Sequence, residues 1–241
     1  RMRFGQAFYE HIQRLYNSVI FDLETRSILS IGPPISYDID DYQKLYPEKE
    51  QNNDNLIIEE MIEGVSIQMF YDFRSKKWEI STKNAVSGNY AYYRNPNYPS
   101  KTYREMFCYV IGVENNDINS WEGIQFMDNK ICYHFILKHP DNHIVFNDVA
   151  PKLYFMGMYK LHIGGVKNNI LYVNCHEEDV FPSTIVCIPE TFLCNTPFTY
   201  EDVIQSHLSI HEDKFIMGIS FLQKLSGDRS FVIHSKYEQL K

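Results

Sequence analysis

The sequence predicts a β-rich protein of the α+β class, and three observations support this prediction. Aromatic residues make up 15% of the 241-residue chain, with 18 Tyr and 16 Phe, and both side chains suit half-buried strands. Short runs rich in Ile, Val, Phe and Tyr are separated by turn-forming residues, as in a series of hairpins. Fewer segments carry apolar residues at helical spacing. We therefore expect many strands and a small number of packing helices.

Strand patterns cover most of the chain. Ser18–Ile31 predicts a hairpin with its turn at Leu23–Arg26. Ile57–Asn89 predicts a strand, a tight turn at Glu63-Gly64, a strand, a polar hairpin tip and a third strand, and the glycine lets the backbone approach a ligand closely. Further strands are expected in four later segments: Ile131–Phe146 (two strands around a Pro-Asp-Asn turn), Leu153–Ile163, Leu171–Asn174 and the tail Phe215–Lys241.

Four segments have the apolar spacing of a helix. They are Phe4–Tyr16, the start of Asp38–Asn55, Tyr103–Val113 and Thr199–His211. In the second, the expected apolar face consists of Ile39, Tyr42, Leu45 and Tyr46. Thr199 is the expected N-cap of the last, because Asp202 follows it by three residues.

Composition limits the classes of function. The formal net charge of −8 argues against a broad face for nucleic acid, although a local basic groove stays compatible with it. The five cysteines include no Cys-x-x-Cys pair, which favours reduced thiols in a cytoplasmic protein. No apolar run approaches the roughly 20 residues that span a bilayer, and no signal pattern begins the chain. We therefore expect no membrane span.

The central stretch contains Met61-Ile62-Glu63-Gly64. This segment resembles motif I, Lys-x-Asp/Glu-Gly, of the covalent nucleotidyltransferases: RNA ligases, DNA ligases and mRNA-capping enzymes. The resemblance is to the adenylation domain of RNA ligases of the phage T4 RNA ligase 1 type, and it extends with gaps from Val19 to Leu240. It implies two antiparallel sheets with flanking helices, in a single domain over residues 1–241 without an appended oligonucleotide-binding domain.

Two later segments extend the resemblance. Five residues fit the Phe-Glu-x-x-x-Pro-x-Asn-Arg-Ile-Val pattern of motif IIIa: Phe135, Pro140, Asn142, Ile144 and Val145. Gly218 and Tyr237 fit motifs IV and V of the same family.

The charged positions of these motifs are altered. Methionine 61 stands in place of the nucleophilic lysine, and Asn17-Ser18 in place of an Arg-Gly that serves the nucleotide phosphates. In motif IIIa, Ile136 replaces the glutamate and His143 the arginine. The remaining replacements are Met217 for the motif IV glutamate and Phe231 and Ile233 for the motif V lysines, or Val232 and His234 in the neighbouring register.

The altered positions remove the family's chemistry. A lysine amine attacks the α-phosphate in these enzymes, and a thioether cannot, so the resemblance implies no intact catalytic residue and no metal ligand. If a nucleotide binds, five residues are the candidates: Glu63, Gly64, Thr82, Lys83 and Arg229. We favour a structural interpretation for part of this set, with Glu63 and Lys83 as an ion pair and Thr82 as a strand residue.

Three functions remain open. The leading hypothesis is a catalytically degenerate, ligase-like protein without a cofactor, because the charged motif positions are altered. Glu59–Gly64 resembles ligase-like proteins of large DNA viruses. The protein would be a binding or structural component in the host cytoplasm or virion. Its partners would be proteins, which the loop Tyr90–Tyr98 would suit, and RNA or a nucleotide are further candidates. The first alternative is an active RNA ligase that uses ATP and Mg²⁺ with an unconventional lysine, or takes pre-adenylated RNA. The second is a sensor of nucleotides or RNA 5′ ends.

Overall fold

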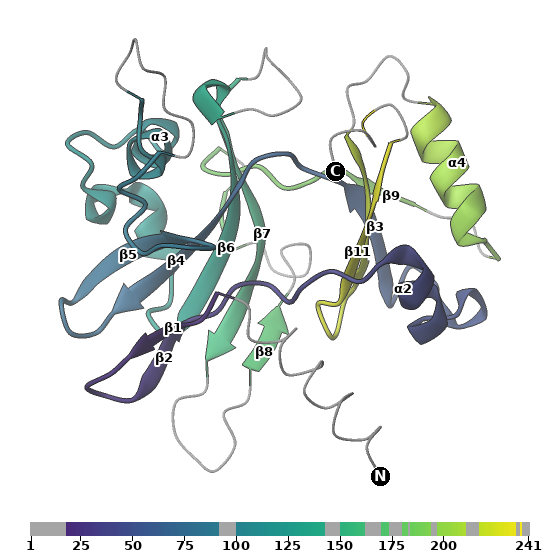
Figure 1. Ribbon diagram of the computed structural model, residues 1–241, viewed down its shortest axis with the longest axis horizontal. Helices are drawn as coiled ribbons and strands as arrows, with labels where there is room; N and C mark the ends of the chain where they lie inside the picture. Colours follow the sequence, from purple (N-terminus) through teal and green to yellow (C-terminus); the bar gives the residue numbers. More distant parts are fainter. Residues whose placement is uncertain are drawn as a thin grey trace. The chain divides into compact units, whose positions relative to one another are not determined.

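The computed structural model describes residues 18–91, 100–142, 150–161, 170–173, 180–182, 184–193, 197–210, 217–234 and 237. The chain forms two compact units. Unit 1 consists of Arg1–Pro33 and Glu63–Ile188, and unit 2 of Pro34–Ile62 and Pro189–Lys241. Each unit has its own sheet and its own hydrophobic core (Figure 1). That both units form one nucleotidyltransferase domain stays a prediction.

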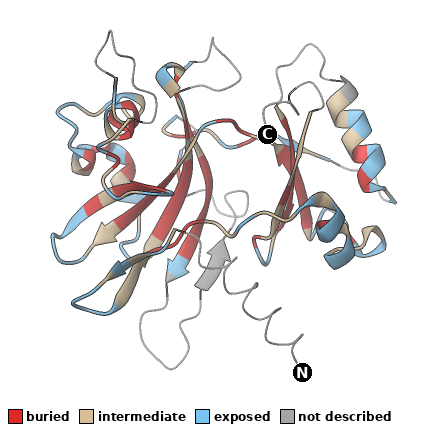
Figure 2. Ribbon diagram, in the orientation of Figure 1, coloured by how far each residue is buried: buried red, intermediate tan, exposed pale blue. Residues whose placement is uncertain are grey.

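Unit 1 is built on an antiparallel five-stranded sheet in the order β5-β4-β6-β7-β8. Its strands are β4 (Val65–Asp72), β5 (Lys77–Thr82), β6 (Ile131–Lys138), β7 (Lys152–Leu161) and β8 (Ile170–Val173). Helix α3 (Tyr103–Val110) and the short 3₁₀ helices η2 (Ile118–Ser120), η3 (Glu122–Phe126) and η4 (Pro140–Asn142) complete it. Aromatic rings dominate the core: Phe181 contacts Trp121, Phe135 and Phe155 at centroid distances of 5.1–5.8 Å. Figure 2 shows these central strands as mostly buried.

A separate hairpin precedes this sheet. Strand β1 (Ile20–Asp22) pairs with β2 (Ser27–Ser30), and β2 lies next to β4 (Figure 1). A small cluster of buried residues joins hairpin and sheet: Ile31, Phe70, Cys132 and Tyr159. Polar contacts reinforce the junction, because the Ser30 hydroxyl donates to Gln68 Oε1 over 2.7 Å in a buried position.

Unit 2 has a four-stranded antiparallel sheet in the order β11-β10-β3-β9. The strands are β3 (Leu56–Glu60), β9 (Thr191–Phe192), β10 (Gly218–Gln223) and β11 (Arg229–Ile233). Helices α2 (Ile39–Leu45) and α4 (Tyr200–Ile210) lie on one side of this sheet (Figure 1), and the 3₁₀ helix η1 (Glu48–Glu50) follows α2. The core between helices and sheet consists of Tyr42, Leu56, Ile58, Tyr200, Val203, Ile219 and Phe221.

Most predicted elements are confirmed, and the α+β class with them. The hairpin turn at residues 23–26 and the Thr199 cap are both present, and Thr199 Oγ1 accepts from the Asp202 N–H over 3.0 Å. Among the described helices none is long and apolar enough to cross a membrane. The predicted helix Phe4–Tyr16 and the second strand of Ile131–Phe146 lie outside the described residues.

Two predictions need correction. Leu45 is 53% exposed rather than part of the apolar face of α2, because the helix ends there and Tyr42 fills the core instead. The turn expected at Glu63-Gly64 connects two different sheets, since β3 pairs with β10 and β9 whereas β4 pairs with β5 and β6. The hairpin β1–β2 also adds a third, two-stranded sheet.

Helix α3 has local signals at both ends. Thr102 and Glu105 form a capping box, in which each side chain accepts from the backbone N–H of the other. At the C-terminus, Val113 donates to the Cys108 carbonyl over 2.9 Å and Gly112 to that of Tyr109 over 3.2 Å. Gly112 has φ +70°, so these bonds form the Schellman motif that glycine favours. The helix therefore ends before Val113, where the apolar pattern alone extended it.

The capping box should contribute measurably to stability. We expect Thr102→Ala to lower the free energy of unfolding by about 1 kcal/mol, because the N–H of Glu105 loses its side-chain acceptor. Thr102→Ser keeps the hydroxyl and should differ from the parent by only a few tenths of that amount. Urea unfolding of the three proteins measures both differences. Equal losses for Ala and Ser would contradict the assigned role of the hydroxyl.

Candidate functional site

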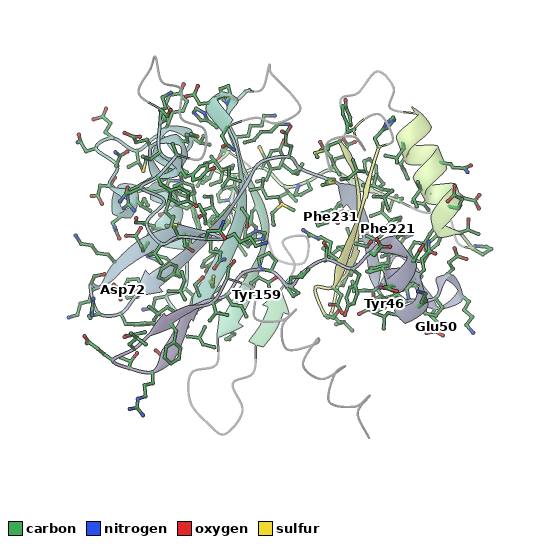
Figure 3. The ribbon with its side chains drawn as sticks, viewed as in Figure 1. Tyr46, Glu50, Asp72, Tyr159, Phe221 and Phe231 are labelled. Atoms are coloured by element: carbon green, nitrogen blue, oxygen red, sulfur yellow. The ribbon has the colours of Figure 1, made fainter. Side chains whose placement is uncertain are left out.

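The two faces of the unit 2 sheet differ in chemistry. Side chains alternate between faces along a strand. Ile219 and Phe221 of β10 belong to the core under α2 and α4. The opposite face therefore carries Ser220, which lies between Glu59 on β3 and Phe231 on β11 in the strand register. Figure 3 labels Phe221 and Phe231, one from each face.

Of the four altered motif positions in unit 2, three share this second face. Ile233 pairs with Gly218 in the register, and Phe231 lies two residues earlier on the same strand. The N–H of Met61 donates to the Gly218 carbonyl over 2.9 Å, so Met61 continues β3 and shares the face of Glu59. The same alternation assigns Met217 to the helix-covered face. The structure thus brings Met61, Phe231 and Ile233 together on one face and separates Met217 from them.

Arg229 lies on the same face and forms a buried ion pair. Its Nη2 is 2.7 Å from Glu59 Oε1, and the two side chains are 11% and 0% exposed. Its guanidinium also lies 5.7 Å from the ring centroid of Phe231. A carboxylate at this distance offsets most of the charge that a phosphate would need. We therefore assign Arg229 a structural role within the unit 2 sheet, as the ion-pair partner of Glu59.

Glu59, the partner of Arg229, is not among the predicted site residues. Glu59 follows a run of buried residues, Leu56–Ile58, and is itself fully buried. A charged residue in a fully buried strand needs a partner of opposite charge. That requirement was readable from the sequence, but the identity of the partner depends on the pairing of β3 with β10 and β10 with β11.

In unit 1, the backbone of Gly64 packs closely against strand β6. Its φ is +155°, and a Cβ there would lie 2.5 Å from the Leu137 carbonyl oxygen and 2.6 Å from Ile136 Cγ2. The glycine therefore allows β4 to start against β6, a structural role distinct from the expected approach to a ligand. Ile136, which stands where the motif has glutamate, contacts this position with an aliphatic side chain. Glu63 precedes it and is 9% exposed.

Thr82 and Lys83 lie at the end of β5. The Thr82 hydroxyl is hydrogen-bonded to the Tyr90 hydroxyl, so Thr82 stabilises the loop that follows β5. Lys83 is exposed, and its carbonyl accepts a 2.9 Å bond from Ser18 Oγ. The predicted ion pair between Glu63 and Lys83 is wrong: the structure holds no such contact, because Lys83 leaves the strand where the chain turns towards solvent.

Within the described ranges, no group of three or more His, Cys, Asp or Glu side chains could hold a metal ion.

Solved structures with a similar fold exist for other proteins, although sequence comparison finds none. No protein-family model and no curated protein matches the sequence. An Aquifex aeolicus protein described as an ATP-dependent DNA ligase matches the structure with a TM-score of 0.56 and 12% identity, covering 91% of this chain and 53% of its own. A lysine-to-methionine variant of a Naegleria gruberi RNA ligase with AMP and Mn matches with a TM-score of 0.55 and 12% identity, covering 95% and 62%.

A lysine-to-alanine variant of the same RNA ligase, with ATP and Mn, matches with a TM-score of 0.53 and 13% identity, covering 90% and 66%. The protein therefore has the RNA/DNA ligase-like nucleotidyltransferase fold. Its chain spans between about half and two thirds of the length of these structures. At this level of identity the likeness extends to the fold alone.

Proposed function

We propose that the protein uses a ligase-like scaffold for binding and forms no covalent nucleotidyl intermediate. The observation that supports this most is the second face of the unit 2 sheet, where Met61, Phe231 and Ile233 gather and the nearby cation, Arg229, is paired with Glu59. Apolar side chains suit a surface that holds neither phosphate nor metal.

The chemistry of the side chains supports the same proposal. Covalent nucleotidyl transfer needs an amine that loses a proton and attacks the α-phosphate, while pyrophosphate leaves. The Met61 thioether has no proton to lose. A divalent ion prefers carboxylate and carbonyl oxygens, whereas Ile136 and Met217 supply hydrocarbon and thioether groups at the positions of the motif glutamates. Among the described residues, the side chains at these motif positions therefore do not fit a divalent metal ion.

Label transfer tests this proposal. The protein is incubated with α-labelled ATP or GTP and either Mg²⁺ or Mn²⁺, and an active RNA ligase serves as the control that takes the label. We expect no covalent label on the protein after denaturing electrophoresis at neutral or alkaline pH, where a lysine phosphoramidate is stable. An adduct at any lysine would overturn the proposal and support a ligase with an unconventional nucleophile. Joining of a 5′-adenylated RNA to an acceptor strand would equally support an enzyme.

Restoring the nucleophile alone should not restore the reaction. We expect Met61→Lys to take no label, because Phe231 and Ile233 replace the cations that would bind the phosphates and the described cation on this face, Arg229, is paired with Glu59. Circular dichroism confirms that the variant is folded before the assay. If Met61→Lys took the label, the loss of the lysine alone would account for the lack of activity, and the other altered positions would not matter.

A second candidate is non-covalent binding of a nucleotide or an RNA 5′ end. The Ser220 hydroxyl is buried on the second face and has no hydrogen-bond partner in the part of the chain that the structure describes. The similar RNA ligase structures contain ATP or AMP with Mn. The test is a melting curve with ATP, GTP or 5′-phosphorylated RNA, where binding raises the midpoint.

A matched pair of variants sharpens this test. Ser230 is equally buried and its hydroxyl also lacks a partner among the described residues, but it pairs with Phe221 and belongs to the helix-covered face. Binding at the second face predicts a smaller ligand-induced shift for Ser220→Ala than for Ser230→Ala. Identical shifts, or none for the parent protein, would count against this candidate.

The resemblance of Glu59–Gly64 to ligase-like proteins of large DNA viruses supports a further part of the proposal. The protein would be a binding or structural component of such a virus, with protein partners, in the host cytoplasm or the virion. The loop Tyr90–Tyr98, expected to contact a partner, lies mostly outside the described residues. Mass spectrometry of purified virions tests this assignment, and absence from both virions and host cytoplasm would contradict it.

A further inference from the structure

Unit 1 contains a groove whose lining includes none of the motif positions named above. It has a volume of about 450 Å³ and is formed by the β1–β2 hairpin, the ends of β4 and β5, and the loop after β5. The hairpin and these strands lie beside one another in Figure 1, and Figure 3 labels Asp72 at the end of β4. None of the residues that resemble ligase motifs lines this groove.

The rim of the groove is unusually apolar. Phe21, Leu23 and Val86 are 49%, 83% and 50% exposed, although each is a large hydrophobic side chain. Phe70 also lines the groove, is 2% exposed and belongs to the buried cluster that joins the hairpin to the sheet. Single exposed apolar residues are common, but a contiguous set around a concave surface is typical of an interaction site.

The same groove is acidic. Its lining contains four carboxylates, Asp22, Glu24, Asp72 and Glu79, and one guanidinium, Arg74. Glu79 is paired with Arg104, which lies outside the lining, so these six groups carry a formal charge of −2. Arg74 already pairs with Glu24 over 3.1 Å. Apolar side chains ringed by negative charge complement a segment that has both basic and apolar residues.

Turn geometry fixes two of these carboxylates in place. Asp22 accepts the hydroxyl of Thr25 over 2.8 Å and the N–H of Glu24 over 2.9 Å. Asp72 accepts the N–H of Arg74 over 3.0 Å. The hydrogen bonds from Thr25 and Glu24 hold the pKa of Asp22 below its ordinary value, so this carboxylate keeps its charge at neutral pH. A partner therefore meets a preorganised acidic surface.

We propose that this groove binds a partner protein through a segment in which Lys or Arg residues flank a large apolar side chain. The apolar side chain would lie between Leu23 and Val86, and the basic groups would meet Glu24 and Asp72. Nucleic acid is disfavoured, because its phosphates would be repelled by the same carboxylates. This binding is independent of any nucleotide and of the second face of the unit 2 sheet.

The probe is a short fluorescein-labelled peptide of Lys and Leu, with its binding to the full chain measured by fluorescence anisotropy. Two control peptides replace Lys by Glu or Leu by Ser. We expect the Lys/Leu peptide to bind at least about tenfold more tightly than either control. Equal binding of the Lys/Leu and Lys/Ser peptides would reduce the interaction to net charge and overturn the proposal.

Matched variants locate the binding. Glu24→Arg is compared with Glu50→Arg, which makes the same change of charge at an exposed position in unit 2. Leu23→Ser is compared with Leu225→Ser, whose parent side chain is 87% exposed. We expect a loss of at least about tenfold for each groove variant and less than about twofold for each control. Equal losses within a pair would overturn the location.

Competition identifies the occupant. Excess RNA oligonucleotide should leave the bound peptide in place, whereas displacement by RNA would overturn the choice of a protein partner. A peptide of residues 1–17, which contains Arg1, Arg3 and Arg14 beside apolar residues, is the remaining competitor. If it displaced the probe at lower concentration than the Lys/Leu peptide itself, the occupant would be this chain's own segment and the proposal of a separate partner would fail.

Discussion

Replacing Arg229 with methionine is expected to lower the free energy of unfolding by about 3–5 kcal/mol, the largest single effect that we expect. The substitution removes the cation that lies 2.7 Å from Glu59 and leaves a carboxylate in a fully buried position. Water cannot reach that carboxylate to solvate it. Urea unfolding of the full chain measures the loss.

Two controls separate this effect from a simple loss of charge. Replacing both Glu59 and Arg229 with methionine removes the ion pair as a whole, and we expect the double variant to recover most of the stability. Arg74→Met breaks an exposed pair with Glu24, whose side chains are 69% and 71% exposed, and should cost only about 0–1 kcal/mol. A double variant as unstable as Arg229→Met would contradict the assigned cause.

Replacing Gly64 with alanine should have the second-largest effect, about 2–5 kcal/mol. The new Cβ would lie 2.5 Å from a backbone oxygen of Leu137, and the φ of +155° is one that alanine rarely adopts. The start of β4 must then move away from β6. Thermal or urea unfolding measures the loss of stability.

Gly112→Ala provides the matched control for this prediction. Gly112 also has a positive φ of +70°, but a Cβ there meets nothing within 4 Å. Its replacement should cost about 1 kcal/mol, the backbone strain alone. The difference between the two variants measures the steric contact with β6. Equal losses would mean that Gly64 is required for its φ and not for its contact with the neighbouring strand.

The sequence predicted local elements better than their assembly. The hairpin β1–β2 and the N-terminus of α4 carry their own signals, a turn between two apolar runs and a threonine cap, and both are confirmed. The strands β3 and β4 are only four residues apart in sequence but belong to different sheets. Their apolar patterns are alike, so nothing local indicates which partner each would choose.

The candidate site shows the same limit. Met61, Phe231 and Ile233 were identified from their motif positions, and strand register brings them onto one face. Arg229 was a candidate for nucleotide binding, whereas it pairs with Glu59, a residue distant in sequence. Charge pairing inside a sheet depends on which strands become neighbours. A single sequence shows which residues are charged, but it does not show which strands will be adjacent.

The order of strands in unit 2 has a consequence for synthesis on the ribosome. Strand β3 emerges early, yet its neighbours β9 and β10 begin at Thr191 and Gly218. Throughout the intervening translation, the apolar run Leu56–Ile58 has both hydrogen-bonding edges unsatisfied. The strands β4 to β8 can pair during that time, because all of them precede Pro189. We infer that the nascent chain exposes an aggregation-prone segment until β9 and β10 have been synthesised, and that its yield in cells depends on how well chaperones shield β3.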